Sequence, residues 1–304
     1  MTGRTRPTRL RPGSTVAVVA PAGPVDPAKL DRGVEVLRGW GLRVTVGEHV
    51  LDRHPDLPYL AGTDAHRAAD LQRAWCDPDV DAVVCARGGY GATRMVDLLD
   101  WDAMAAAGPK VFTGASDITA LHTAIGTQLD LVTLFSTIIA DVSFDAAAQE
   151  HLRATLFEPH TMLTLTGPAV ATMNHGTATG LVTGGNLSLL TAGIGCTPPP
   201  PDDAIVLLEE VNEEPYRLDR MITQLLCAGW FTGVAGIALG SWTGCGEPSE
   251  VYAVLADLLG GLGLPTVWEL GFGHCPGQLT IPLGVEATLD AEAGTLTLTE
   301  PALR

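Results

Sequence analysis

Short apolar runs alternate with segments of helical spacing along the first 130 residues. The run Thr15–Ala20 is apolar at successive positions, which is typical of a strand buried on both faces of a parallel sheet. In Pro27–Trp40, Leu30, Val34 and Leu37 fall on one helical face. Further strands are predicted at Leu42–Val46, Val80–Cys85 and Lys110–Thr113, and further helices at Thr63–Trp75, Thr93–Leu99 and Asp117–Gln128. The alternation predicts an α/β fold whose mainly parallel sheet is flanked by helices.

The alternation breaks between residues 141 and 178, where Leu163–Leu165 and Thr177–Val182 are typical of short strands of another kind. We therefore expect an N-terminal domain at 1–140, a linker region at 141–178 and a C-terminal domain at 179–304. In the C-terminal part the pattern predicts strands at 204–208 and 237–239, helices from 187 to about 195, at 215–228 and at 251–259, and a terminal antiparallel hairpin built from 279–282, 287–289 and 296–298.

Composition narrows the class of protein. The chain has 304 residues, of which 46% are hydrophobic and 17% charged, so it can bury a large core and is not disordered. The 18 basic and 35 acidic residues give a net charge of −17, which disfavours a nucleic-acid partner. The N-terminal arginines followed by Val16–Ala20 resemble a signal peptide, but this run is too short and Pro21 follows it, so we interpret it as the first strand.

No stretch of 18 uninterrupted apolar residues occurs, so we expect no membrane span. The six cysteines are scattered and form no C-x-x-C pair, which predicts reduced thiols, a cytoplasmic location and no zinc-ribbon site.

Two turns that follow predicted strands have the composition of functional loops. The glycines of Gly88–Gly91 allow backbone N–H groups to point into a site. A dinucleotide fingerprint would need a glycine where Arg94 stands, so a donor loop for an oxyanion or carboxylate and a plain tight turn are the other interpretations. Ser116 lies on a strand-to-helix turn and resembles a nucleophile elbow, although Ile118 replaces the last glycine of G-x-S-x-G. The alternative is that Ser116 or Asp117 caps the helix.

An acid and a histidine follow strands in the second half. Glu209 and Glu210 end the strand at 204–208, at the sheet edge where ligands gather, or they form a solvated acidic corner. His274 lies on a glycine-flanked loop, whereas the other seven histidines have polar or helical surroundings and are interpreted as ordinary. Ser116, Glu209 and His274 together supply the nucleophile, acid and base of a triad, whose order along a chain varies between folds. The N–H groups of Gly89 and Asp117 would form its oxyanion hole.

These motifs, taken as a set, resemble the LD-carboxypeptidase family of serine peptidases, which includes murein tetrapeptide carboxypeptidases and microcin C immunity proteins. The similar segments keep their order over nearly the whole chain: AVVAPAGP at 17–24, GTDAHRAADL at 62–71, RGGYGATR at 87–94, GASDITAL at 114–121, GGNLSLL at 184–190, LLEEVNEEPYRLDRMITQ at 207–224, GH at 273–274 and TIPLG at 280–284. The resemblance implies a flavodoxin-like or class I glutamine amidotransferase-like N-terminal sheet, a smaller β-rich α/β C-terminal domain, a site between the two domains, and a homodimer. It also implies Ser116 as nucleophile, His274 as base, and Glu209 rather than Glu210 as the acid.

The implied reaction is cleavage of an L,D amide bond near a free carboxylate, with release of terminal D-Ala from murein tetrapeptide in peptidoglycan recycling and no metal or other cofactor. The partner is then a small peptide or peptide-like amide substrate. A substrate carboxylate calls for a cation. Candidates for substrate binding are Arg87, Tyr90, Arg94, Asn186, Arg217 and Arg220, where any one arginine could instead form a structural or surface ion pair.

One segment departs from the family pattern. A His-Gly-Pro sequence is expected after the nucleophile helix, and Leu134–Thr137 stands there instead. This departure keeps open a second hydrolase function, on a microcin-like peptidyl-nucleotide or another antibiotic amide. A non-catalytic peptide-binding module and, more distantly, an NAD-dependent enzyme are the remaining classes.

Overall fold

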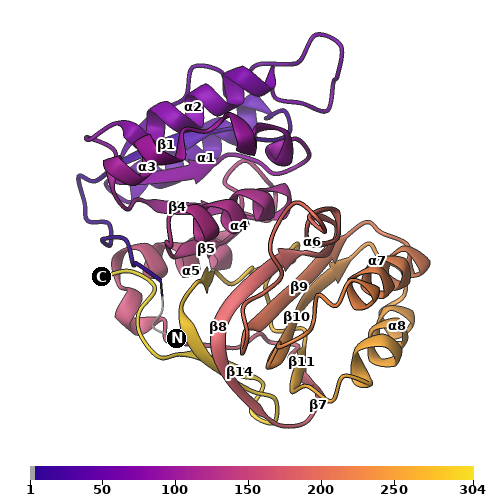
Figure 1. Ribbon diagram of the computed structural model, residues 1–304. Helices are drawn as coiled ribbons and strands as arrows, with labels where there is room; N and C mark the ends of the chain where they lie inside the picture. The colour runs from indigo at the N-terminus through magenta and orange to yellow at the C-terminus, as the bar shows by residue number, and fades with distance from the viewer. Residues whose placement is uncertain (1–3) are drawn as a thin grey trace.

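A computed structural model describes residues 4–304, which form two sheets with helices packed on their faces (Figure 1). The first sheet has six strands in the order β12-β5-β4-β3-β1-β2. Its strands are β1 (Thr15–Val19), β2 (Arg43–Val46), β3 (Ala82–Cys85), β4 (Val111–Gly114), β5 (Thr133–Phe135) and β12 (Ile281–Leu283). Strands β1 to β5 are parallel, and β12 pairs antiparallel with β5.

The helices around the first sheet begin at recognisable caps. The Asp26 side chain accepts a hydrogen bond from Lys29 N at 2.9 Å at the start of α1, and Thr63 accepts one from His66 N at 3.2 Å at the start of α2. The α-helices are α1 (Pro27–Gly39), α2 (Asp64–Cys76), α3 (Trp101–Ala107), α4 (Thr119–Gln128) and α5 (Ala146–Phe157), and the 3₁₀ helices are η1 (Ala92–Leu98), η2 (Ser116–Ile118) and η3 (Pro159–Thr161).

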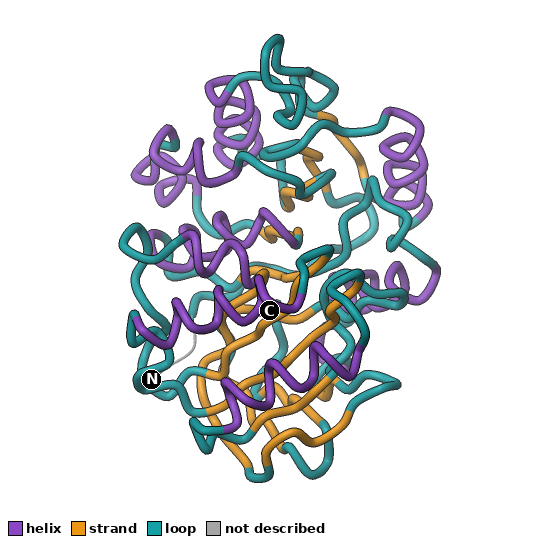
Figure 2. Tube along the Cα trace, turned by 90° about the vertical axis from the view of Figure 1, so that its right-hand side faces the viewer, coloured by secondary structure: helices purple, strands orange, loops and turns teal. Residues whose placement is uncertain are grey.

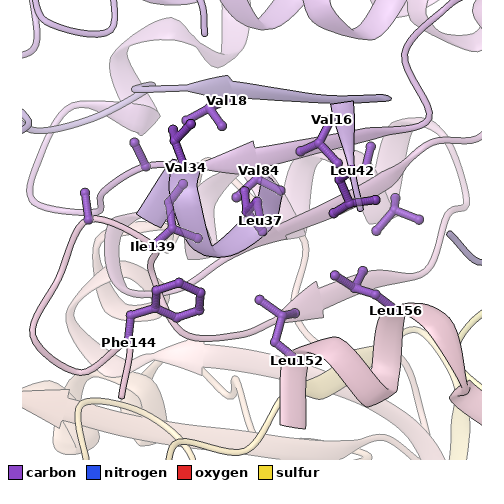
Figure 3. Packing of buried hydrophobic residues seen from close by; sticks show 14 of the residues in the cluster. Val16, Val18, Val34, Leu37, Leu42, Val84, Ile139, Phe144, Leu152 and Leu156 are labelled. Carbon is purple, nitrogen blue, oxygen red and sulfur yellow. The ribbon is translucent and has the colours of Figure 1, made fainter. Parts of the chain in front are cut away.

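One hydrophobic core of the first sheet lies between its strands, α1 and α5. Figure 3 shows side chains of the strands facing those of the two helices. The labelled residues of this core are Val16, Val18, Val34, Leu37, Leu42, Val84, Ile139, Phe144, Leu152 and Leu156. A second core, which includes Trp75 and Phe112, covers the opposite face against α2 and α4. Burial on both faces explains why these strands are apolar at successive positions.

The second sheet has eight strands in the order β6-β14-β13-β8-β9-β10-β11-β7. Its strands are β6 (Thr164–Leu165), β7 (Ala171–Asn174), β8 (Thr177–Asn186), β9 (Ile205–Val211), β10 (Gly236–Thr243), β11 (Thr266–Trp268), β13 (Glu286–Asp290) and β14 (Thr295–Leu298). Strands β8 to β11 are parallel, and the remaining pairs are antiparallel. The helices of this part are α6 (Leu187–Ala192), α7 (Pro215–Cys227) and α8 (Pro248–Gly260). The predicted fold class, a mainly parallel N-terminal sheet followed by a β-rich C-terminal domain, is confirmed.

Several elements differ from their sequence-based prediction. Helices α3 and α5 were not predicted, and α5 lies in the segment expected to be a linker, where it packs on the first core. The segment 279–282 was expected in the terminal hairpin, but that hairpin consists of β13 and β14 alone. Strand β12 instead crosses to the first sheet and lies beside β5 (Figure 1).

The two ends of the described chain also meet. Arg9 N donates to Arg304 O at 2.9 Å, and Arg304 N donates to Pro7 O at 2.9 Å, so the last residue pairs with the segment that precedes β1. Figure 2 marks the C-terminus near the middle of its view. The six cysteines are all free. Within residues 4–304, no helix has the length and apolar character needed to cross a bilayer.

Candidate active site

Ser116 lies on a tight turn between β4 and α4. Its φ of +62° puts a non-glycine residue in the left-handed region, which is uncommon and concentrates at functional sites. The next side chain, Asp117, is buried and accepts a hydrogen bond from Ala92 N at 2.7 Å. Burial raises the pKa of Asp117 to about 6, although the Ala92 hydrogen bond and the Arg67 charge act in the opposite direction. The Asp117 carboxyl therefore fixes the serine turn to the start of η1.

The Gly88–Gly91 turn packs directly against this serine. A Cβ atom on Gly88 would lie 2.8 Å from Ser116 Cβ, so only glycine leaves room for the serine side chain. Gly88 O accepts a hydrogen bond from Gly23 N at 2.8 Å, which holds the turn in place. Among residues 4–304, the N–H of Gly89 has no hydrogen-bond acceptor, so it is free to bind a ligand oxygen.

Glu209 and His274 form the second half of the site. His274 Nδ1 lies 2.7 Å from Glu209 Oε2, and the Glu209 side chain is fully buried at the end of β9. Gly273 has a φ of +95°, and a Cβ there would lie 2.7 Å from Glu209 Oε2. Thr243 Oγ1 donates to the backbone carbonyl of His274 at 2.5 Å. The imidazole is therefore held against the carboxylate through both its ring and its backbone.

A chain of hydrogen bonds connects the serine helix to this pair. Asn186 N donates to Thr119 Oγ1 at 3.0 Å, and Thr119 is the first residue of α4. The Asn186 side-chain amide donates to Glu209 Oε1 at 3.2 Å and to Glu210 Oε1 at 2.9 Å. The side chain of Asn186 thus bridges the two buried carboxylates, and its backbone N–H connects them to α4 of the N-terminal domain.

The electrostatics of the site favour a basic imidazole. Burial by itself lowers the pKa of His274, but the hydrogen-bonded Glu209 carboxylate and the charges of Glu210 and Asp141 outweigh it, so the pKa is raised. Burial also raises the pKa of Glu210, against hydrogen bonds from Ser188, Val211 and Asn186. Within residues 4–304, the Ser116 hydroxyl and the imidazole share no hydrogen bond, and His274 Nε2 has no partner. Such contacts often tighten only when substrate binds.

The other residues proposed from the sequence lie in different settings. Tyr90 is 51% exposed and meets Tyr59 edge-on, with ring centroids 5.6 Å apart. Asn186 is buried on the two glutamates. The guanidinium groups all have partners: Arg87 donates to Pro24 O, Arg94 Nε to Asp64 Oδ2 at 3.0 Å, Arg217 lies 3.3 Å from Glu213, and Arg220 stacks on Tyr216 at 5.3 Å.

Two contributors to the site were not predicted from the sequence. Thr119 accepts the Asn186 backbone N–H, and Asp141 adds negative charge near His274. Both lie far from their partners along the chain; Thr119 stands within the GASDITAL segment, but nothing in that segment points to Asn186, and Asp141 lies in none of the similar segments. The departing segment at 134–137 is also buried: the Phe135 ring packs edge-on against Phe272, with centroids 6.1 Å apart, and Ser136 N donates to Gly114 O at 3.0 Å.

A serine on a strained strand-to-helix turn, a free backbone N–H beside it and a histidine bound to a buried carboxylate are the parts needed for acyl transfer by a serine hydrolase. Comparison with known proteins agrees with this class. The LD-carboxypeptidase N-terminal domain matches residues 16–136, and the LD-carboxypeptidase C-terminal domain matches residues 179–289. The chain belongs to the LD-carboxypeptidase family.

Individual relatives cover almost the full chain. A Streptomyces coelicolor protein, whose name describes it as a carboxypeptidase, is 58% identical over 303 residues, which is 98% of this chain and 97% of the relative. The murein tetrapeptide carboxypeptidase of Pseudomonas aeruginosa is 30% identical over 296 residues, with 90% and 92% covered. Among solved structures, the microcin immunity protein MccF bound to glutamyl sulfamoyl guanosine superposes with a TM-score of 0.87 at 23% identity, over 98% of this chain and 99% of that one. This last likeness concerns the fold.

Proposed function

We propose that the protein is a serine carboxypeptidase that cleaves an L,D amide bond next to a free carboxylate and releases terminal D-Ala from murein tetrapeptide. The observation that carries this proposal is the 2.7 Å contact between His274 Nδ1 and the buried Glu209 Oε2, in a fold that also strains Ser116 into the left-handed region. The P. aeruginosa relative named as a murein tetrapeptide carboxypeptidase supports the substrate class.

In the proposed mechanism, His274 Nε2 takes the proton of Ser116 while the serine oxygen attacks the substrate carbonyl. The N–H groups of Gly89 and Asp117 bind the oxyanion that forms. His274 then gives its proton to the leaving amine, and water resolves the acyl-enzyme. Glu209 holds the imidazole tautomer and stabilises the imidazolium, consistent with the raised pKa of His274.

Arg87 is the best candidate for binding the substrate carboxylate. Arg94 and Arg217 already pair with Asp64 and Glu213, and Arg220 stacks on the Tyr216 ring, away from the serine turn in sequence. Arg87 precedes the turn that packs on Ser116, and within residues 4–304 it has no acidic partner, since it binds a backbone carbonyl. Its charge therefore remains available for an anion. An Arg87→Ala variant should raise KM for the tetrapeptide much more than it lowers kcat.

A second hydrolase function is supported by the fold and by the departing segment. The chain superposes on a microcin immunity protein over nearly its whole length, and Phe135 and Ser136 stand where the family pattern has His-Gly-Pro. An aminoacyl sulfamoyl nucleoside is therefore the appropriate alternative substrate.

The deciding experiment incubates the protein with each substrate and identifies the products by mass. Wild type and the control Ser249→Ala, whose serine is exposed on α8, should release D-Ala, and Ser116→Ala should not. Release of D-Ala by Ser116→Ala would refute the serine mechanism. Cleavage of the nucleoside alone would replace the first function by the second. A fluorophosphonate that labels wild type but not Ser116→Ala tests the nucleophile without assuming a substrate.

A further inference from the structure

Three metal-ligating side chains meet in the loop between β2 and α2, outside the catalytic constellation. They are His49 and Asp52 of the loop and His66 of the first turn of α2. We propose that they form a binding site for one divalent transition-metal ion, which ties the loop at residues 47–63 to α2. Their sequence surroundings give no sign of this, because the fold, not the spacing, brings His66 to the other two.

The donor atoms have the spacing of neighbouring ligands around one ion. His49 Nδ1 lies 2.9 Å from Asp52 Oδ2, and His66 Nδ1 lies 3.1 Å from the same oxygen. One donor atom from each residue lies within 4.8 Å of the other two. Adjacent ligands of an octahedral ion with bonds of about 2.1 Å are about 3.0 Å apart. The two imidazole rings stack nearly parallel, with centroids 4.0 Å apart and an interplanar angle of 18°, so one ring must turn before both Nδ1 lone pairs can point at the same ion. Water would fill the open positions.

The backbones of the two histidines are fixed by interactions outside the cluster. His49 N donates to Asp70 Oδ2 at 2.7 Å, and His66 N donates to the capping Thr63 hydroxyl at 3.2 Å. Gly62 closes the loop on Asp52: its φ is +78°, and a Cβ there would lie 2.9 Å from Asp52 Cβ. A site assembled in advance loses less conformational entropy when an ion binds.

The chemistry selects the class of ion. Two imidazoles and one carboxylate suit Zn²⁺, Co²⁺, Ni²⁺ or Fe²⁺ better than Mg²⁺ or Ca²⁺, which prefer oxygen ligands. Glu48 Oε2 lies 4.0 Å from His49 Nε2, beyond hydrogen-bond distance, and adds a negative charge beside the cluster that favours a cation. The half-exposed side chains of His66 and Asp52, 48% and 38% accessible, leave a path for the ion to enter.

The loop reaches the neighbourhood of the serine turn. It carries Tyr59, whose ring contacts Tyr90, and Tyr90 follows Gly89. An ion at its base would therefore reduce the mobility of the Tyr59–Tyr90 pair. Any effect of that reduced mobility on catalysis rests on the proposed function. Binding of the ion does not rest on it.

The test is a titration of the untagged full-length protein with Co²⁺, followed by absorption spectroscopy and calorimetry. The exposed thiols of Cys196 and Cys227 are alkylated first, which removes the most accessible sulfur ligands, and the protein is stripped with EDTA. We expect one ion per chain with a Kd in the micromolar range and a spectrum of nitrogen and oxygen ligands. Zn²⁺ should compete for the same site and raise the Tm of the wild type.

His66→Ala and the near-isosteric Asp52→Asn should each weaken Co²⁺ binding at least tenfold. The matched control is His175→Ala, which removes another histidine beside a carboxylate, 3.3 Å from Glu292, and should leave binding unchanged. Circular dichroism confirms that each variant is folded. The absence of stoichiometric binding, or binding that both cluster variants retain, would overturn the proposal and leave the three residues as a hydrogen-bonded clamp. Neither result depends on whether the protein hydrolyses an amide.

Discussion

The close approach of Gly88 to Ser116 makes a single methyl group a test of the proposed site. In Gly88→Ala the new Cβ would lie 2.8 Å from Ser116 Cβ, 3.1 Å from Ser116 Oγ and 3.1 Å from Ala115 O. The φ of Gly88 is outside the left-handed region, so alanine introduces no backbone strain there. The perturbation is therefore purely steric and is directed at the proposed nucleophile.

The size of the effect follows from the overlap. Carbon atoms pack at about 3.5–4.0 Å, so the serine or the turn must move by roughly 1 Å. A displacement of about 1 Å at a reacting group costs about 10²-fold in rate, or about 2.7 kcal/mol of transition-state stabilisation. Overpacking of this kind also destabilises a fold by about 1–3 kcal/mol. We expect kcat to fall about 10²-fold while the protein remains folded.

The assay compares tetrapeptide hydrolysis and fluorophosphonate labelling in wild type and Gly88→Ala. Both rates should fall by a similar factor, since both depend on the position of Ser116. Gly39→Ala is the control, because a Cβ on Gly39 meets no atom within 4 Å, and it should keep the wild-type rates. A folded Gly88→Ala protein with wild-type kcat would refute the reasoning that this turn positions the nucleophile.

Three further perturbations address the buried titratable groups. Glu209→Gln should lower the pKa of His274 and move the acidic limb of the kcat/KM profile to lower pH, with a loss of about 10³–10⁴-fold in rate; an unmoved limb would contradict the pairing. Asn186→Ala leaves Glu209 and Glu210 without their shared donor and should reduce the unfolding free energy by about 1–3 kcal/mol, measured in urea; unchanged stability would exclude that role. Burial lowers the pKa of His122 to about 4, below the value of about 6.5 that it has in the unfolded chain. The folded protein therefore loses about 3 kcal/mol of unfolding free energy as the pH falls from 6.5 toward 4, and none of it above pH 6.5. His122→Gln should therefore lose less stability than wild type between pH 7 and pH 4.5, and equal losses would count against this origin.

Elements of the first sheet could be predicted because their buried residues follow a simple pattern along the sequence. Strand β1 is buried at every position, and α1 buries Leu30, Val34 and Leu37 on one face. Helices α3 and α5 escaped prediction because alanines dilute their periodicity, although Asp100 and Asp145 cap them in the usual way. Strand β12 could not be placed, since its pairing with β5 joins segments about 150 residues apart and leaves no local trace.

In the candidate site, too, the residues in local motifs could be predicted and the contacts between them could not. Ser116, Glu209 and His274 stand in recognisable motifs because each ends a strand or lies on a glycine-flanked loop. What connects them is tertiary: Thr119 meets Asn186 across the interface of the two domains, and no spacing rule relates the two residues. Loops with ordinary composition are the hardest to interpret, which is why the cluster around Asp52 emerges only from the fold.

The crossing of β12 into the first sheet has a consequence for how the protein unfolds. Residues 281–283 complete the edge beside β5, and Ala302 and Leu303 are buried in the first core, so the C-terminal part of the chain belongs physically to both sheets. Residues 1–140 expressed alone would expose the bare edge of β5, a template for association with other chains. The two halves should therefore melt in one cooperative transition and cannot be exchanged as modules between relatives. A chain end shared by both sheets also opposes hinge motion between the domains, so the closer approach of the serine hydroxyl to the imidazole that catalysis needs should come from side-chain rotation and not from domain closure.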